Sequence, residues 1–391
     1  MNAASQAPYA VQFGAGNIGR GFIAQLFHES GLQVAFVDVM EPVVDRLNRD
    51  GRYIIRIVGP GACDVPITGI CAIHSLDRER IAEAVAGATI VCTAVGAASL
   101  RTVAPAIADG LILRHTRTGS PLNILVCENL HAAGKILRSH VRRNLPRTLR
   151  EPVLENTGFA QAVVSRMVPL QTVAEDGPLL VRVEAYKRLP IDRSAIVGAL
   201  PDIAGVEPVD NFAAHEARKL YTHNCAHATL GYLGWHAGHE YGYQALRDSR
   251  LRRTLDAVLT ETGTALIARF GLSPEEHKAH IADLLERFAN VELGDTCFRL
   301  ARDPIRKLAP NDRLVGAARM CEGEQVEPIA LAEVIGQALR FDPAEDPSAQ
   351  RLQQRIASDG IRNVLHDVCG LAPGERLTAR VLSAYAGRAS V

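Results

Sequence analysis

The chain has 391 residues, enough for two or three domains with ample cores. Lys plus Arg and Asp plus Glu number 43 each and 47% of residues are hydrophobic, so nothing indicates a nucleic-acid partner or a membrane span. The eight scattered cysteines form no Cys-x-x-Cys pair and residues 1–6 lack a signal-peptide pattern, so we expect a cytoplasmic protein with reduced thiols.

The first predicted element is a buried strand over residues 9–13, followed by a glycine-rich turn and a helix over residues 22–27. The turn carries the Gly-x-Gly-x-x-Gly pattern at Gly14, Gly16 and Gly19. The first glycine permits a tight turn, the second lets the backbone approach a diphosphate, and the third lets helix and strand pack closely. We therefore predict a dinucleotide-binding turn; the alternative is a glycine-rich turn in an unrelated α/β fold.

The second predicted strand, residues 33–37, ends in Asp38, about 20 residues past the glycines, where an acidic side chain can accept hydrogen bonds from an adenosine ribose. Asp38 and Glu41 place negative charge there with no nearby Arg or Lys, so a 2′-phosphate would be repelled. The predicted cofactor is therefore NAD rather than NADP.

Strands and helices continue to alternate through the first half of the chain, as in a doubly wound sheet whose ligand binds beyond the carboxyl ends of the strands. Val95 and Asn129 follow two further buried strands. We place the domain boundary at residue 190, giving an α/β Rossmann-type NAD-binding domain (1–190) and a mainly α-helical substrate and catalytic domain (191–391). The predicted helices of the second domain are 251–268, 274–288, 329–339, 349–356 and 378–385.

One further helix carries an unusual set of polar residues. On a regular α-helix, Lys219, His223 and His227 fall within about 80° of one another, and Asn224 lies about 60° beyond His227. Such a face is either a solvated stripe or the wall of a polar pocket. The small, apolar residues 226–235 that follow favour the pocket, because they are typical of a helix packed inside a domain.

These motifs resemble the polyol-specific long-chain dehydrogenase/reductase family over nearly the whole chain, through residues 13–23, 127–130, 219–227 and 303–314. The resemblance implies a metal-independent, NAD-dependent oxidoreductase that interconverts a sugar alcohol, or its phosphate, and the ketose. The expected pair is mannitol 1-phosphate and fructose 6-phosphate. The alternative is an unphosphorylated polyol or a sugar acid, as in enzymes of the mannitol 2-dehydrogenase or altronate/fructuronate type.

The resemblance also implies site residues. Lys219 would be the general base, Asn224 would hydrogen-bond the oxygen as it gains charge, and His227 would orient the substrate. Arg299 and Lys307 would bind substrate oxygens or a phosphate, unless they belong to a solvated basic face with their neighbours Arg302, Arg306 and Arg313. The expected cofactor contacts are Gly14, Gly16, Asn17, Ile18, Gly19, Asp38, Val95 and Asn129.

The chain also departs from the family pattern. Gln161 and Ser165 stand where many relatives have Asn and Asp, and His223 and Cys225 stand where relatives more often have apolar or small residues. These positions approach the substrate, so they leave its identity open.

Two alternatives belong to other functional classes. Zinc could be held by His223, His227, His236 and His239, although no His-Glu-x-x-His motif is present. The other alternative is a non-catalytic NAD-binding regulator, although such a protein would not need the Lys219 amine beside the imidazoles of His223 and His227. We expect a monomer that binds only small molecules.

Overall fold

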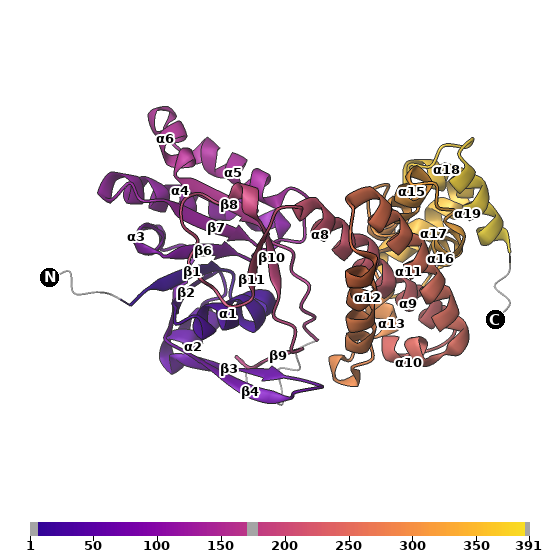
Figure 1. Ribbon diagram of the computed structural model, residues 1–391, viewed down its shortest axis with the longest axis horizontal. Helices are drawn as coiled ribbons and strands as arrows, with labels where there is room; N and C mark the ends of the chain where they lie inside the picture. The colour runs from indigo at the N-terminus through magenta and orange to yellow at the C-terminus, as the bar shows by residue number, and fades with distance from the viewer. Residues whose placement is uncertain (1–6, 170–178, 388–391) are drawn as a thin grey trace. The chain divides into compact units, whose positions relative to one another are not determined.

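The computed structural model describes residues 7–169 and 179–387, and the chain divides into two compact units, Met1–Phe212 and Ala213–Val391 (Figure 1). This division lies later than the boundary we place at residue 190. Two short strands explain the difference, because β10 (Leu189–Asp192) pairs in parallel with β11 (Val206–Val209) and Ile191 bridges to Ala162. Residues beyond 190 therefore complete the core of the first unit.

The first unit contains a six-stranded parallel sheet with the strand order β5-β2-β1-β6-β7-β8. This is the Rossmann order, in which β1 lies at the point where the connections change direction and a dinucleotide binds. The doubly wound prediction is confirmed. The strands are β1 (Tyr9–Phe13), β2 (Gln33–Asp38), β5 (Ile70–His74), β6 (Ile90–Thr93), β7 (Leu122–Val126) and β8 (Thr157–Gln161).

Both faces of the sheet are buried. Successive side chains of a strand point to opposite faces, and each face has its own hydrophobic core. In β1, Ala10 packs with helices α1 and α2, whereas Val11 and Phe13 pack with helices α3 to α6. A smaller sheet of β3, β4 and β9 covers the α1 side (Figure 1). The bounds are α1 (Ala24–Glu29), α2 (Glu41–Asp50), β3 (Arg52–Ile57), β4 (Cys63–Thr68), α3 (Arg78–Gly87), α4 (Leu100–Arg117), α5 (Ala133–Asn144), α6 (Arg150–Glu155) and β9 (Val181–Val183).

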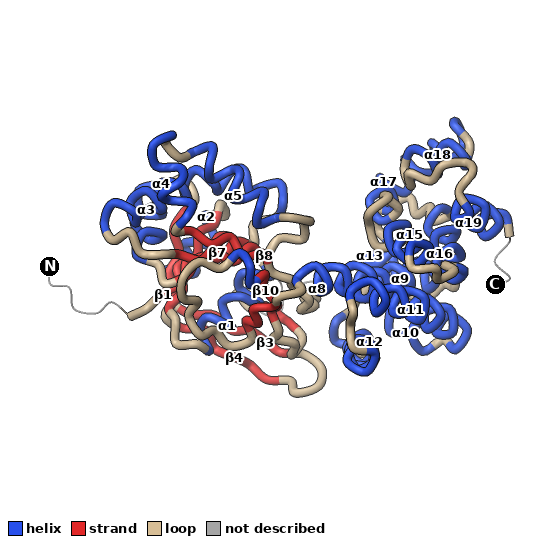
Figure 2. Tube along the Cα trace, turned by 45° about the horizontal axis from the view of Figure 1, so that its top comes forward, coloured by secondary structure: helices blue, strands red, loops and turns tan. Residues whose placement is uncertain are grey.

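The second unit is helical, as predicted (Figure 2). Each of the five helices predicted from the sequence is present. Among the described residues, no helix combines the length and apolar character needed to cross a membrane. The helices are α8 (Phe212–Arg218), α9 (Cys225–His236), α10 (Gly242–Arg247), α11 (Ser249–Phe270), α12 (Pro274–Phe288), α13 (Cys297–Ala301), α14 (Pro304–Lys307), α15 (Val315–Gly323), α16 (Ile329–Leu339), α17 (Pro347–Asp359), α18 (Ile361–Asp367) and α19 (Arg376–Ala386).

Helix α9 lies inside this unit and contacts α10, α11, α13 and α16. Two glycines let α13 approach closely, because a Cβ at Gly231 would lie 2.7 Å from the Ala301 nitrogen and one at Gly234 would lie 2.5 Å from Cys297 Sγ. The prediction that the small, apolar segment is a packed helix is confirmed. The residues just before α9 are therefore held by a rigid core.

Candidate active site

The glycine-rich turn is shaped by the absence of side chains. Gly14 has φ +92° and donates its N–H to Val37 O at 2.8 Å. A Cβ at Gly19 would lie 1.9 Å from Gly14 O, whereas a Cβ at Gly16 would meet nothing within 4 Å. Gly16 and Asn17 are exposed and Ile18 is partly buried. The backbone at Gly19 is thus packed against the turn, whereas the backbone at Gly16 is accessible, as the diphosphate of a dinucleotide requires.

Asp38 is fixed against this turn. Its Oδ2 accepts a hydrogen bond from the Ala15 N–H at 2.6 Å, and its Oδ1 accepts one from the Met40 N–H at 2.9 Å. A carboxylate has about four acceptor positions, so these two bonds orient the group and leave acceptors for a ribose diol.

Val95 and Asn129 follow β6 and β7 at the same carboxyl edge of the sheet. Val95 is partly buried and Asn129 is exposed. Glu128, which directly precedes Asn129, contacts the Val95 loop, although the sequence analysis assigns it no role. The buried Glu128 carboxylate accepts hydrogen bonds from the N–H groups of Val95, at 2.9 Å, and Gly96, at 2.8 Å.

The segment of the second unit that carries the predicted catalytic residues is not a regular α-helix. Lys219–Asn224 forms a π turn, in which the Cys225 N–H donates to Leu220 O, five residues earlier. Such turns occur frequently at functional sites. The 80° arc expected for Lys219, His223 and His227 on an α-helix therefore does not apply, because the wider turn changes the angle between successive side chains.

Lys219 is partly buried, and its pKa is lowered from 10.5 to about 8. Burial is the largest cause, the positive charge of Arg313 adds to it, and Glu216 opposes it. A substantial fraction of this amine is therefore neutral near pH 8, as a general base requires.

His227 is stacked on Phe288, with ring centroids 3.9 Å apart and planes inclined by 21°, and meets the His223 ring edge-on at 4.8 Å. Burial, with smaller contributions from the cations Arg287 and Arg299, lowers its pKa to about 3. The imidazole is neutral at physiological pH, so it can orient a substrate through hydrogen bonds without carrying charge.

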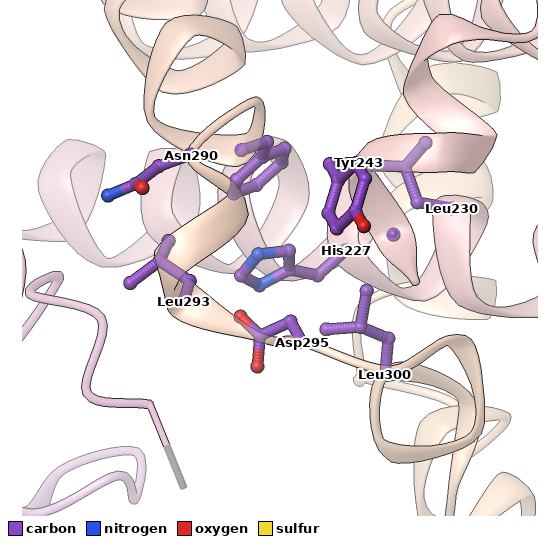
Figure 3. A pocket seen from close by; sticks show the side chains of 9 residues that line it. His227, Leu230, Tyr243, Asn290, Leu293, Asp295 and Leu300 are labelled. Carbon is purple, nitrogen blue, oxygen red and sulfur yellow. The ribbon is translucent and has the colours of Figure 1, made fainter. Parts of the chain in front are cut away.

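A small pocket lies beside His227 (Figure 3). Its volume of about 10 Å³ has room for roughly one water molecule. This pocket alone is therefore too small to hold a hexitol. The lining residues are His227, Leu230, Gly242, Tyr243, Phe288, Asn290, Leu293, Asp295 and Leu300.

The two predicted substrate cations differ in accessibility. The Arg299 guanidinium forms an ion pair with Asp295, which lines the pocket. Lys307 is only 4% exposed, donates to Leu300 O and lies 5.9 Å from the centre of the Tyr232 ring. Burial holds the pKa of Lys307 well below its usual value. A fully solvated basic face is therefore wrong for Lys307, whereas Arg306 is exposed and paired with Asp303.

Gln161, one of the departures from the family pattern, is buried and bonded to backbone. Its Oε1 accepts from the Gly134 N–H at 3.4 Å, and its Nε2 donates to Leu130 O at 3.2 Å. Gln161 thus supports the loop that carries Asn129. Ser165 is partly buried and has interactions within the chain.

The four histidines of the zinc alternative do not gather. His236 Nε2 lies 2.9 Å from Gln337 O, and His239 Nε2 lies 3.3 Å from Asp248 Oδ2. Within the part of the chain that the structure describes, no group of three or more His, Cys, Asp or Glu residues is arranged to hold a metal ion.

Comparisons with known proteins agree with this architecture. The family model of the mannitol dehydrogenase Rossmann domain matches residues 8–205, and that of the mannitol dehydrogenase C-terminal domain matches residues 211–386. A mannitol-1-phosphate 5-dehydrogenase of Brevibacillus brevis is 40% identical over 368 residues, covering 94% of this chain and 95% of the relative. One of Bacillus licheniformis is 40% identical over 375 residues, covering 96% and 98%.

A solved structure shows the same fold. The mannitol 2-dehydrogenase of Pseudomonas fluorescens, in a ternary complex with NAD and D-mannitol, matches with a TM-score of 0.78 at 16% identity, covering 98% of this chain and 92% of that one. The chain belongs to the mannitol dehydrogenase family, which confirms the resemblance, and it is a dehydrogenase with a Rossmann-type nucleotide-binding unit.

Proposed function

We propose that this protein is an NAD-dependent dehydrogenase that interconverts mannitol 1-phosphate and fructose 6-phosphate. The observation that carries the proposal is the amine of Lys219, whose pKa is lowered to about 8 within the Lys-x-x-x-x-Asn-x-x-His segment. The relatives named mannitol-1-phosphate 5-dehydrogenase, which match along nearly their full length, support the substrate.

The cofactor assignment has support in the first unit. The open backbone at Gly16 suits a diphosphate, and Asp38 offers carboxylate oxygens to a ribose diol and negative charge against a 2′-phosphate. When bound, NAD would take a hydride from the carbinol carbon. The remaining chemistry is assigned to the protein's own side chains.

Lys219, in its neutral form, would remove the hydroxyl proton as the carbon loses its hydride. Asn224 would donate a hydrogen bond to the same oxygen while negative charge develops on it. The neutral His227 would orient that oxygen. In the reverse direction the protonated Lys219 would return the proton to the ketose oxygen.

The charge around His227 supports an anionic substrate. Arg287, Arg299 and Arg313 all lower the pKa of this imidazole, so several cations act on one position, although each also forms an ion pair with an aspartate. A phosphate dianion uses such cations as charge partners and hydrogen-bond donors. A sugar acid would satisfy them too, which makes a keto-acid a necessary comparison.

The test is a panel of fructose 6-phosphate, fructose and a hexose-derived keto-acid, each reduced with NADH. We expect kcat/KM for fructose 6-phosphate to exceed the others by several orders of magnitude. Comparable values for fructose would assign the protein to unphosphorylated polyols, and a preference for the keto-acid would assign it to sugar acids.

Arg299→Ala sharpens this test. It should raise KM for fructose 6-phosphate by roughly tenfold or more and leave KM for fructose nearly unchanged, because only the phosphate needs the guanidinium. Arg306→Ala is the matched control, since Arg306 is an exposed cation nearby in sequence that is ion-paired with Asp303 and Asp312. An equal loss on both ketoses in Arg299→Ala would remove Arg299 from phosphate binding.

A further inference from the structure

Glu128 is a buried carboxylate whose contacts are unusual. It follows β7, its side chain is 6% exposed, and each of its two oxygens accepts one backbone N–H, from Val95 at 2.9 Å and from Gly96 at 2.8 Å. The two donors are consecutive residues of the loop after the neighbouring strand β6. One side chain therefore clamps the loop of the adjacent strand at two points.

Burying a carboxylate is costly unless it is paired or hydrogen-bonded. Among the described residues, no Lys, Arg or His forms an ion pair with Glu128, so the two N–H groups are its compensation. Hydrogen bonds to a carboxylate are roughly twice as strong as neutral ones. Gly96 has φ +88°, a conformation that side chains disfavour, so the clamp holds the loop in one particular shape.

The position of this loop in the sheet indicates what the clamp serves. β1 lies between β2 and β6, and the cofactor of such a sheet binds across the carboxyl end of β1, with one half on each side. Asp38, at the end of β2, marks the adenosine side. The Val95–Gly96 loop, at the end of β6, therefore lies on the nicotinamide side.

We propose that Glu128 is a positioning residue that holds the Val95–Gly96 loop in the shape required by the nicotinamide half of the cofactor. It acts through the loop and does not touch the cofactor itself. The inference rests on the proposed NAD cofactor. It adds a residue that contributes to binding the nicotinamide half of NAD and not the adenosine half.

The test compares NADH with ADP-ribose, which keeps the adenosine, the diphosphate and the second ribose but lacks the nicotinamide ring. Glu128→Gln replaces one acceptor oxygen by an NH₂ group that faces an N–H donor, so the loop loses one of its two bonds. Calorimetric titration should show Kd for NADH raised roughly tenfold and Kd for ADP-ribose changed less than about twofold.

Two variants serve as controls. Glu184→Gln changes another buried carboxylate of the same unit that accepts a backbone N–H, from Met167, and should leave the ratio of the two Kd values as in the unmodified protein. Asp38→Ala should weaken NADH and ADP-ribose together, because both ligands contain the adenosine ribose.

Equal losses for the two ligands in Glu128→Gln, or no loss for either, would overturn the inference. If a lowered Tm shows that Glu128→Gln folds poorly, Glu128→Asp carries the test: it keeps the charge but is one methylene shorter, and a selective loss of NADH is again required. Failure of the unmodified protein to bind NADH at all would instead overturn the proposed cofactor.

Discussion

The glycine-rich turn and the Lys219–His227 segment are built in opposite ways. At the turn the useful atoms belong to the backbone, and space is made by omitting side chains at Gly14, Gly16 and Gly19. At the segment the useful atoms belong to side chains, and their pKa values depend on burial and on the charges of residues distant in sequence, such as Arg313. A site of the first kind is encoded locally, whereas a site of the second kind is defined only by the folded unit.

The largest expected effect comes from removing the amine. Lys219→Ala should lower kcat by roughly a hundredfold or more, the usual contribution of a general base, while Kd for NADH stays nearly unchanged. Steady-state kinetics and a binding titration measure the two quantities. Lys278→Ala, which removes an exposed amine of the same unit, is the control. A kcat within a few-fold of the unmodified protein would show that another group takes the proton.

Adding a methyl group at two glycines of the turn should show which glycine is needed for cofactor binding and which for stability. Gly16→Ala meets no protein atom, so its Tm should be unchanged while its Kd for NADH rises roughly tenfold or more. Gly19→Ala collides with Gly14 O and should cost about 1–3 kcal/mol of unfolding free energy. Thermal unfolding with NADH titration distinguishes them. Unchanged NADH affinity in Gly16→Ala would place the diphosphate elsewhere.

The pH dependence of the reaction rate tests the Lys219–His227 segment directly. Since Lys219 must be neutral to accept a proton and its pKa is about 8, the rate of alcohol oxidation should rise about tenfold between pH 7 and pH 9. Ketose reduction needs the protonated amine and should fall over the same range. Glu216→Gln removes a charge that raises the Lys219 pKa, so its profile should move to lower pH. A profile that does not move would mean that another group controls the rate.

The smallest effect concerns cofactor choice. Asp38→Ser removes the charge that opposes a 2′-phosphate, so the preference for NADH over NADPH should narrow several-fold. Asp45→Ser changes an exposed carboxylate of the helix that follows and should leave the preference intact. The measurement is kcat/KM for both cofactors. Equal use of both by the unmodified protein would refute the role of Asp38.

Local patterns predicted four of the six strands of the parallel sheet, because β1, β2, β6 and β7 are apolar runs bounded by turn residues. β5 and β8 were not predicted: in β8 the sequence Thr-Gly-Phe-Ala-Gln has no such run, and its burial comes from neighbours distant in sequence. At Gly158 a Cβ would lie 2.1 Å from Asn123 Oδ1, a constraint that no local pattern shows. The clamp formed by Glu128 was missed for the same reason.

In the second unit, the spacing of Lys219, Asn224 and His227 predicted a polar face but not its electrostatics. Arg287 and Arg313, which act on the pKa values of these residues, come from 60 or more residues further along the chain. The π turn was also beyond prediction, since the spacing of polar and apolar residues does not distinguish it from an ordinary α-helix.

That π turn has a consequence for insertions and deletions. Removing one residue between Leu220 and Asn224 would let the hydrogen bonds return to α-helical spacing, so the helix itself would survive. Because the turn contains one residue more than α-helical spacing needs, this deletion would leave α9 nearly in its present orientation relative to Lys219. An added residue in α9 would instead rotate everything after it by about 100°, and the small faces at Gly231 and Gly234 would turn away from α13. The segment should therefore tolerate the loss of one residue better than the gain of one.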